Sequence, residues 1–317
     1  MIGADIFAML ACPVCRDGDL AGLEGALAAD GDVRCTTCGT SYNVRGGIPI
    51  LLPPDFDASH VHDEIDHAHK HRQAEHYDRA VAEEFEISRP HGAPMAYTWL
   101  LREKFRRSVE RLPALRGASV VDACCGSGMD AEMLARAGAR VIAIDISEGS
   151  ARRAKARAER YGLEYAVVVG DVERLPVRDR AVDIGYVHDG LHHLADPAAG
   201  LREVARVARQ AVSVNEPADA FGTAVAVRLG AALATEEAGN AVARLRADDA
   251  ARELAAAGFD AAARRYFMYY KHEPGGAMQL ASRPGLRIAY RAAIRASDAA
   301  IGRWGNKLQV TALRRAA

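Results

Sequence analysis

The sequence lacks a long uninterrupted run of apolar residues. Its longest apolar stretch, around residues 221–234, is too short to span a bilayer and is interrupted by Arg228. The first eleven residues have no basic segment and contain Asp5, so they do not have the pattern of a secretion signal. From these absences we expect a cytoplasmic protein with no membrane partner.

An excess of charge of either sign is also missing. The chain has 41 lysines and arginines against 42 acidic residues, and its formal net charge is −1. This balance argues against a strongly electrostatic nucleic-acid-binding protein, although a local basic face remains open. Half of the 317 residues are hydrophobic, which is enough to build one large domain and a small one.

Cysteines are few, and the six that are present do not form the pattern of a disulfide framework. Four of them form two C-x-x-C pairs separated by 19 residues, a spacing within the range of zinc ribbons. Two such turns supply four thiolates, which suits tetrahedral zinc. We therefore predict a structural zinc site, and for the adjacent Cys124 and Cys125 we favour core packing over thiol chemistry. The predicted zinc ligands are Cys12, Cys15, Cys35 and Cys38.

Composition divides the chain into three parts. Residues 1–56 hold the cysteine pairs, residues 57–96 form a histidine-rich linker or lid, and residues 97–317 alternate helix and strand. Strands separated by helices imply a parallel sheet that is covered on both faces. We predict an α/β, Rossmann-like fold with a seven-stranded, mostly parallel sheet, preceded by a small zinc ribbon. Helical insertions are expected at residues 218–246 and 274–304.

The expected elements follow from hydrophobic periodicity and from glycine, proline and capping residues. Strands are expected at residues 118–123, 140–144, 164–169, 182–187, 211–214, 261–272 and 307–313. Helices are expected at residues 77–87, 99–112, 129–137, 147–161, 197–208, 218–246, 248–257 and 286–301, with Ser147 as an N-cap.

A glycine loop follows the first strand of the large domain, at residues 120–128. Gly126 and Gly128 let the backbone approach a ligand that a side chain would block. The amides that open the next helix can bind a carboxylate, and Asp122 at the strand end can hold an amino group. Asp145 ends the second strand, where a carboxylate can accept both hydroxyls of a ribose.

Residues 126–131 also fit the dinucleotide fingerprint G-x-G-x-x-A, so this stretch alone does not distinguish two kinds of cofactor. Asp122 would face a pyrophosphate unfavourably and therefore favours S-adenosylmethionine. After the third strand, Asp171 can hydrogen-bond the exocyclic amine of adenine, and Val172 can pack on the ring. Residues 183–194 end the fourth strand and lead into the same site.

Together these motifs resemble class I S-adenosylmethionine-dependent methyltransferases over about residues 97–317. The resemblance is closest to the subgroup with small-molecule members such as quinone-biosynthesis enzymes. That family usually has glycine or alanine where Cys124 stands, so we expect that the small thiol fits with a slight displacement of the loop. The resemblance implies that the cofactor is bound by Asp122, Cys124, Gly126, Gly128, Asp145, Ile146, Asp171, Val172 and His188.

Three residues are candidates for the chemistry of methyl transfer. His192 and His193 follow the fourth strand, and either can act as a base or contact the acceptor. The alternative is that His192 packs on the cofactor and that His193 caps the next turn. Glu216, at the end of the fifth strand, is a further inward-facing candidate. Alignment of the acceptor supplies much of the rate, so a base is needed only for an acceptor proton of high pKa.

The ribbon carries a resemblance of its own. Residues 8–54 are similar to the small zinc-ribbon proteins that partner methyltransferases of the translation machinery, through residues 10–15, 35–39 and 42–52. A similar ribbon precedes some ribosomal-RNA guanine methyltransferases. The resemblance implies a stabilising or substrate-positioning module rather than a catalytic one.

The favoured function is methyl transfer to a small or medium-sized metabolite, with the helical insertions forming the pocket or a homodimer interface. The alternative is an rRNA or tRNA methyltransferase that positions RNA with its ribbon. A third hypothesis is a non-catalytic module that activates a partner. For the histidine-rich linker we favour a lid over a second metal site. For the arginine-rich runs at residues 102–116 and 152–160 we favour solvated faces over RNA contacts.

Overall fold

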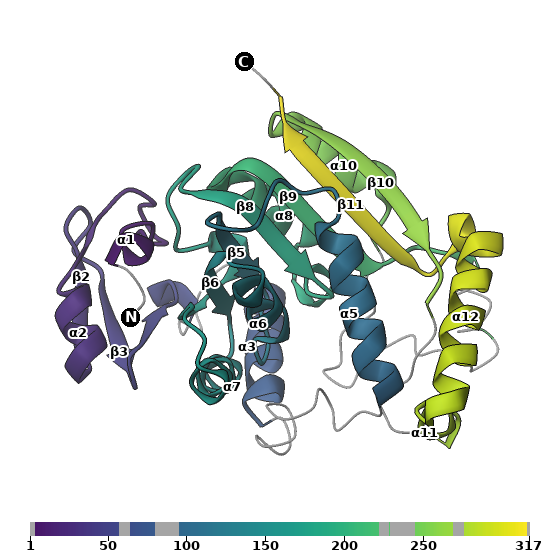
Figure 1. Cartoon of the computed structure of the whole chain (residues 1–317). Coiled ribbons are helices and arrows are strands. Elements are labelled where there is room, and N and C mark those ends of the chain that lie inside the picture. Colours follow the sequence, from purple (N-terminus) through teal and green to yellow (C-terminus); the bar gives the residue numbers. More distant parts are fainter. Residues whose placement is uncertain are drawn as a thin grey trace.

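In the part of the chain that the structure describes, the strands form one eleven-stranded sheet (Figure 1). The computed structural model describes residues 4–56, 64–79, 95–221, 228, 245–268 and 276–315. The strand order is β1-β2-β3-β4-β7-β6-β5-β8-β9-β11-β10. The α/β class predicted from the sequence is therefore confirmed.

Five parallel strands form the centre of this sheet. They are β7 (Ala166–Gly170), β6 (Arg140–Asp145), β5 (Ser119–Ala123), β8 (Val182–His188) and β9 (Ala208–Pro217). At one side β11 (Lys307–Arg314) pairs antiparallel with β9, and β10 (Phe259–Tyr266) pairs antiparallel with β11. These are the seven strands that the sequence predicts for the large domain.

Helices cover both faces of the sheet. One face carries α5 (Met95–Val109), α6 (Met129–Arg136) and α7 (Glu148–Tyr161), and the other carries α8 (Pro197–Val207) and α10 (Ala247–Ala256). Every residue of β5 is buried, and in β6 only the first is not. Strands buried on both faces need apolar side chains at odd and even positions, which explains their continuous apolar sequences.

Neighbouring residues of one strand enter different cores. In β6, Ile142 and Ile144 pack on the side of α8, whereas Val141 and Ala143 pack against α6 and α7. The predicted N-cap of α7 is confirmed, because the Ser147 side chain accepts a hydrogen bond from the backbone amide three residues on.

The ribbon is part of the same sheet rather than a separate layer in front of it. Its strands β1 (Leu20–Ala21), β2 (Gly31–Cys35), β3 (Ser41–Arg45) and β4 (Ile48–Leu51) are antiparallel to one another. β4 then pairs in parallel with β7. The predicted count of seven strands is correct for the large domain and too small for the whole sheet. The reason is that β7 has an open edge whose backbone groups need partners, and β4 supplies them.

The remaining elements lie at the ends of the sheet and around the linker. The helices are α1 (Ala4–Phe7), α2 (Leu23–Ala29), α3 (Glu64–Asp78), α11 (Gly276–Ala281) and α12 (Pro284–Ile301). The 3-10 helices are η1 (Pro54–Phe56), η3 (Val172–Arg174), η4 (Leu191–His193) and η5 (Gly302–Trp304). None of the helices in the described part of the chain is long and apolar enough to cross a membrane.

Several expectations fall partly outside the described residues. The helix expected at 77–87 overlaps only the end of α3, and residues 80–94 are not described. The helix expected at 218–246 lies mostly in undescribed residues. The strand expected at 261–272 corresponds to β10, which begins two residues earlier and ends at Tyr266.

Arg107, Arg153 and Arg157 contradict the expectation that the arginine-rich runs form solvated faces. They are 6%, 4% and 3% exposed. Each guanidinium has a specific partner that makes burial possible: Arg107 pairs with Asp298, and Arg157 pairs with Glu132. Arg153 donates to the backbone carbonyl of Tyr77.

Asp183 joins three neighbouring strands. Its carboxylate accepts hydrogen bonds from the amide and hydroxyl of Ser119, at 2.8 Å each, and from Arg209 and Gln210. Burial alone would raise its pKa, but the hydrogen bonds from Arg209 and Ser119 outweigh burial and lower the pKa to about 2. The ionised carboxylate therefore stabilises the fold.

We expect Asp183→Asn to lower the free energy of unfolding by about 2 kcal/mol at neutral pH. Because the folded pKa lies below the unfolded one, this stabilisation is present above pH 4 and disappears as the pH falls toward 2. Urea unfolding at several pH values measures the difference between the two proteins. Asp260→Asn, at a side chain that is 74% exposed, is the control and should change little. A difference that stays constant with pH would contradict the assignment.

Candidate cofactor and acceptor site

The predicted cofactor residues meet at the carboxyl ends of four adjacent parallel strands. Asp122 precedes the end of β5, Asp145 ends β6, Asp171 follows β7, and His188 ends β8. The strand register places Asp122 beside Tyr186, and Asp145 beside Val169. The structure therefore brings these four side chains together at the carboxyl ends of the parallel strands.

Glycine is needed at the two positions of the loop after β5 for different structural reasons. Both have positive φ, +51° at Gly126 and +76° at Gly128, a region that favours glycine. A β-carbon at Gly128 would lie 3.0 Å from the side chains of Ala154 and Tyr165, so this glycine permits close packing on α7. A β-carbon at Gly126 would meet no atom within 4 Å, so the space beside that backbone is open.

Cys124 has φ of +57°, in the region where glycine is favoured. This is the position at which the sequence departs from the family that it resembles, and the structure shows that the thiol is accommodated by its neighbour. A β-carbon on Gly190 would lie 2.4 Å from the Cys124 β-carbon and 3.0 Å from its sulfur. The small residue at position 190 therefore compensates for the side chain at position 124.

We expect Gly190→Ala to lower the free energy of unfolding by about 2 kcal/mol, because the added methyl overlaps Cys124. In a Cys124→Gly background most of this loss should disappear, which a double-mutant cycle by urea unfolding would measure. Gly285→Ala is the control, since its new methyl would meet no atom within 4 Å. Equal losses in both backgrounds would show that the two positions are independent.

Asp145 holds the glycine loop as well as lying at the predicted ribose position. Its carboxylate accepts the Gly126 amide at 2.8 Å and the Ser147 amide at 3.0 Å. Burial raises the pKa of Asp145, while these two backbone hydrogen bonds act in the opposite direction. Each carboxylate oxygen retains a second lone pair that can accept a hydroxyl. Ile146, the next residue, lines a cavity of about 360 Å³ between the ribbon, α3 and the start of α7.

Asp122 is 2% exposed. Burial raises its pKa well above the ordinary value, and the nearby Asp130 and Asp145 raise it further. Within the described part of the chain, one of its carboxylate oxygens has no hydrogen-bond partner. Buried polar atoms normally have partners, so this oxygen needs a donor from a ligand or from water.

Helix α3 lies over the predicted adenine position. The ammonium of Lys70 is 2.7 Å from the carboxylates of both Asp171 and Glu173. Val172, between them, is buried in the core on the α8 side. The motifs of the large domain give no sign of Lys70, because it comes from the histidine-rich linker about one hundred residues earlier in the chain.

Two further sets of contacts fix α3. Asp78 accepts hydrogen bonds from the Ser147 hydroxyl and the Gly149 amide, at 2.7 Å each, at the start of α7. His69 contacts the carbonyl of His193 at 2.7 Å, and the Tyr77 hydroxyl lies 3.3 Å from the His193 ring nitrogen. The helix therefore spans from α7 to the turn η4, across the ends of β6, β7 and β8.

Glu216 and His192 form a buried pair. One carboxylate oxygen of Glu216 accepts the amides of Gly190 and Leu191 at 2.8 Å, and the other lies 2.7 Å from Nδ1 of His192. Burial alone would raise the pKa of Glu216, but the interaction with His192 brings it below its ordinary value. The carboxylate thus holds the turn η4 and orients the His192 ring.

A second polar cluster, which the motifs did not predict, surrounds the end of β8. Nδ1 of His188 lies 2.9 Å from Asp130, which also accepts the Tyr186 hydroxyl at 2.7 Å. Asp189 pairs with Lys104 of α5 and with Lys307 of β11. Burial would raise the pKa of Asp189, but the two lysines hold it well below its ordinary value.

Only part of this cluster has a signal in the sequence. Asp189 follows His188 directly, and Asp130 lies in the first turn after the glycine loop, so both could be found from the motifs. Lys104 sits inside an arginine-rich run that is typical of a solvated helix, and yet it is 1% exposed. Long-range packing of α5 and β11 brings the two lysines to Asp189.

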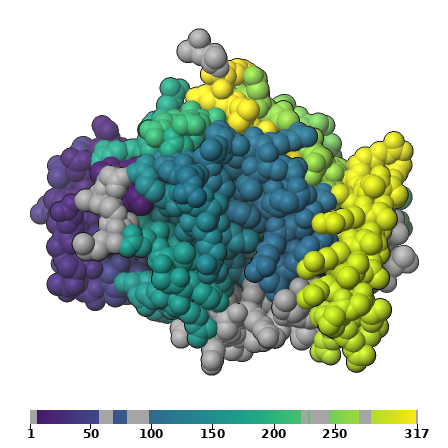
Figure 2. All heavy atoms as spheres, in the orientation of Figure 1, coloured from purple at the N-terminus to yellow at the C-terminus, as the bar shows by residue number. Residues whose placement is uncertain are grey.

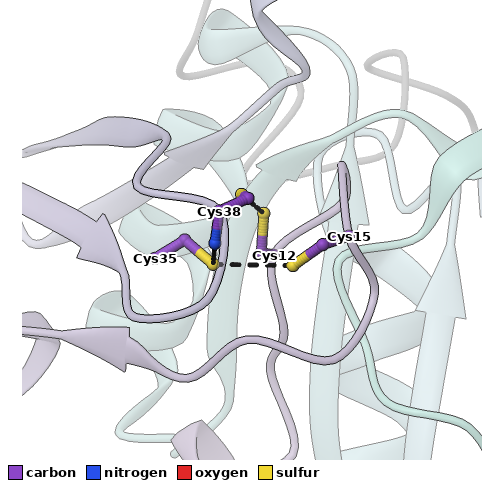
Figure 3. Close-up of side chains that lie close together, drawn as sticks. All are labelled: Cys12, Cys15, Cys35 and Cys38. Carbon is purple, nitrogen blue, oxygen red and sulfur yellow. Dashed lines mark hydrogen bonds between the residues drawn. The ribbon is translucent and has the colours of Figure 1, made fainter.

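The four cysteines of the two C-x-x-C pairs converge in the ribbon (Figure 3). Their sulfur atoms all lie within 4.8 Å of one another, with 3.6 Å between Cys12 and Cys38 and 3.5 Å between Cys15 and Cys35. Tetrahedral zinc with bonds of about 2.3 Å separates its sulfurs by about 3.8 Å. The donor set and its spacing therefore fit zinc.

Residues around the four cysteines also favour metal binding. The Tyr42 hydroxyl lies 2.9 Å from the Cys12 sulfur, the kind of outer hydrogen bond that orients a metal ligand. Hydrogen bonds from the hydroxyl and backbone of Thr40 lower the pKa of Cys38 to about 6, which favours a thiolate at neutral pH. A β-carbon at Gly18 would lie 2.1 Å from the Cys35 sulfur, so only glycine fits there.

The parallel sheet, the glycine loop after β5 and the acid at the end of β6 together define a class I methyltransferase fold. More particularly, residues 121–213 match the family described as "Methyltransferase domain". The resemblance predicted from the motifs is confirmed for this part of the chain, which carries a methyltransferase domain.

Curated relatives match the same region. Demethylmenaquinone methyltransferase from Corynebacterium kroppenstedtii is 35% identical over 100 residues, which are 32% of this chain and 41% of that protein. An uncharacterized 37.1 kDa protein in transposon TN4556 of Streptomyces fradiae is 38% identical over 104 residues, 32% of this chain and 30% of that protein. The matches thus span less than half the length of these relatives.

Solved structures show the same fold. The YcgJ protein from Bacillus subtilis is similar with a TM-score of 0.50 and 16% identity, over 68% of this chain and 100% of that chain. Magnesium protoporphyrin IX methyltransferase from Synechocystis, with bound SAM, has a TM-score of 0.50 and 16% identity, over 78% of this chain and 97% of that chain. At this identity the likeness concerns the fold alone.

Proposed function

We propose that this chain transfers a methyl group from S-adenosylmethionine to a small or medium-sized metabolite. The observation that carries this function is the set of carboxylates around an open glycine loop, within a segment that matches a methyltransferase domain. Several relatives over this segment are named demethylmenaquinone methyltransferase, which supports a small-molecule acceptor.

The residues present fit this cofactor. The unpartnered oxygen of Asp122 can accept from its amino group, and the open space at Gly126 leaves room for its methionine end. Asp145 can accept the ribose hydroxyls, and Asp171 can accept the adenine amine beside Lys70. When bound, the cofactor supplies a methyl group that its sulfonium makes electrophilic. Cys124, Ile146 and His188 complete the cofactor site that we propose, and Gly128 and Val172 support it by packing on α7 and in the core on the α8 side.

On the acceptor side, we assign different roles to His192 and Glu216. Glu216 is fully buried and bonded to the turn η4, so it acts as a positioning residue. The hydrogen bond at Nδ1 fixes the His192 ring and directs its other nitrogen away from Glu216, where it can contact the acceptor or remove its proton. His193 contacts α3, so it links the acceptor side to the helix over the cofactor.

Helix α3 is the lid of this site in our proposal, and the four cysteines hold a structural zinc ion. The ribbon then stabilises the β7 edge next to the adenine position rather than taking part in the chemistry. The division at residues 56 and 96 and a homodimer through the helical insertions remain predictions. So does the likeness of the ribbon to methyltransferase partners, and so does the third hypothesis, a non-catalytic module that activates a partner.

RNA methylation is the second candidate, and one observation weighs against it. A groove of about 670 Å³ is lined by Arg106, Arg107, Arg264, Arg265 and Arg303. It lies between α5, β10 and η5, near the β10 edge of the sheet, whereas the ribbon occupies the β1 edge. Among the described residues, the arginine-lined groove, which also contains Glu110 and Asp298, and the ribbon therefore lie at opposite edges of the sheet, which weighs against one continuous RNA-positioning surface.

The test is a transfer assay with methyl-labelled S-adenosylmethionine, preceded by calorimetry with the unlabelled cofactor. We expect binding, followed by transfer of label to a demethylated quinol in an organic extract. Purified rRNA and tRNA serve as competing acceptors in the same reaction. Label in RNA would support the second candidate, and no binding at millimolar cofactor would support the non-catalytic module and contradict the proposed function.

A further inference from the structure

Helix α12 turns apolar side chains toward solvent and much of its charge toward the protein. Arg287, Arg291 and Asp298 are half-buried, and Ile294 is 7% exposed. The exposed positions of the helix are almost all apolar, and Arg295 flanks them. They include Leu286, Ile288, Ala289, Ala292, Ala293, Ala296, Ala299 and Ala300. This is the reverse of an ordinary surface helix, whose charged residues face water.

Contacts with α5 fix this orientation. The guanidiniums of Arg291 and Arg295 lie 5.2 Å and 5.9 Å from the centre of the Trp99 ring, and Tyr290 meets the same ring edge-on at 6.2 Å. Asp298 pairs with Arg107 of α5 at 2.8 Å. Rotating the helix to bury its apolar face would break all of these contacts.

Exposed apolar side chains concentrate on this part of the molecule. Among the described residues, eight large hydrophobic side chains are exposed, and five of them lie within residues 280–304. They are Leu280, Leu286, Ile288, Ile301 and Trp304, of which Ile288 is 72% exposed. We call residues 280–304 the α12 surface; α12 lies at the end of the molecule opposite the ribbon (Figures 1 and 2).

The α12 surface is also strongly basic in a chain that is not. Residues 280–304 contain five arginines and one acid, Asp298, which gives a local net charge of +4 against −1 for the whole chain. Arg283, Arg295 and Arg303 are exposed, whereas Arg287 and Arg291 are half-buried. Arg303 also covers the ring of the exposed Trp304, at 3.7 Å from its centre.

The combination of exposed apolar side chains and positive charge distinguishes between possible partners of the α12 surface. A second copy of this chain would bring two surfaces of charge +4 together, which opposes self-association. RNA would use the arginines but leave the leucine and isoleucines in water. A bilayer with anionic headgroups accepts both, because the exposed Arg283, Arg295 and Arg303 can pair with phosphates while apolar side chains and tryptophan enter the interface.

We propose that the α12 surface docks on membranes that contain anionic phospholipids, with α12 lying in the plane of the interface. At 1.5 Å per residue its 18 residues would extend about 27 Å along the bilayer. The prediction of no membrane partner rested on the lack of a spanning segment, and surface docking needs none. Docking does not depend on methyl transfer, and we expect it whatever reaction the protein catalyses.

Vesicle sedimentation with the full chain tests this inference. We expect binding to vesicles of equal parts phosphatidylcholine and phosphatidylglycerol, little binding to phosphatidylcholine alone, and loss of binding at high salt. Ile288→Asp should weaken binding to the mixed vesicles by about tenfold or more, since it replaces an inserted apolar group with a repelled charge. Leu313→Asp, at an exposed leucine on β11, is the matched control and should bind as the parent does.

Other outcomes overturn the inference. They are equal binding to both kinds of vesicle, equal effects of the two variants, or no binding at all. Tighter binding to RNA than to vesicles, or a dimer that Ile288→Asp dissociates, would assign the surface to RNA or to a second copy instead. Unfolding curves establish that both variants are folded, as expected for exposed side chains.

Discussion

Replacing Cys35 with serine is expected to abolish zinc binding and unfold the ribbon. The sulfur of Cys35 is one of the four in the cluster and lies 3.5 Å from that of Cys15, and its residue is 1% exposed. Structural zinc contributes about 10 kcal/mol or more to the folding of small ribbons, so we expect residues 10–52 to lose their structure. Metal analysis and limited proteolysis measure the two losses directly.

The control for this prediction is Cys125→Ser, which changes a buried cysteine outside the cluster. It should retain one zinc ion per chain and an intact ribbon. Treatment of the parent protein with a strong chelator should reproduce the effect of Cys35→Ser. A Cys35→Ser protein that keeps its zinc, or a chelated protein whose ribbon resists protease, would show that metal does not hold these strands.

Asp145→Asn is expected to weaken S-adenosylmethionine binding by about 100-fold. The change removes the charge that strengthens hydrogen bonds to two ribose hydroxyls, a loss of about 3 kcal/mol. The amide group of asparagine would also face one of the backbone donors, Gly126 or Ser147, and so disturb the glycine loop. Calorimetry with the cofactor measures the affinity.

Asp179→Asn is the matched control for Asp145→Asn, because Asp179 is an aspartate of the same domain that is 71% exposed and far from the loop. It should bind the cofactor as the parent protein does. If Asp145→Asn bound with unchanged affinity while its fold stayed intact, the ribose position proposed for this carboxylate would be wrong. A loss in both variants would point to a nonspecific effect of charge.

Local sequence signals predicted the parts of the fold that depend on local physics. The continuous apolar strands β5 to β8 had to be buried on both faces, and Ser147 had to cap a helix, because few other structures satisfy those residues. The pairing of β4 with β7 had no such signal. Backbone hydrogen bonds join strands more than one hundred residues apart, and any apolar strand can provide them.

The residues of the candidate site likewise divide into those that local motifs predicted and those that the sequence did not reveal. Glycine and acidic residues of the loop and strand ends lie in short motifs, so Asp122, Gly126 and Asp145 could be predicted together. Lys70 and Lys104 were missed because each belongs to a polar helix whose sequence is typical of a solvated surface. Their burial is decided by what α3 and α5 pack against, which the periodicity of a single helix does not contain.

Because the ribbon and the large domain belong to one chain, the contact between them does not have to hold two separate molecules together. Two residue pairs join β4 to β7, Ile50 with Val169 and Leu51 with Gly170, and Arg16 and Arg178 add contacts between the ribbon and the large domain. The tether adds to these contacts, because it keeps the local concentration of the strand near the millimolar range. Cutting the connection would therefore make the pairing of β4 depend on protein concentration, and loss of β4 would expose β7 to other chains.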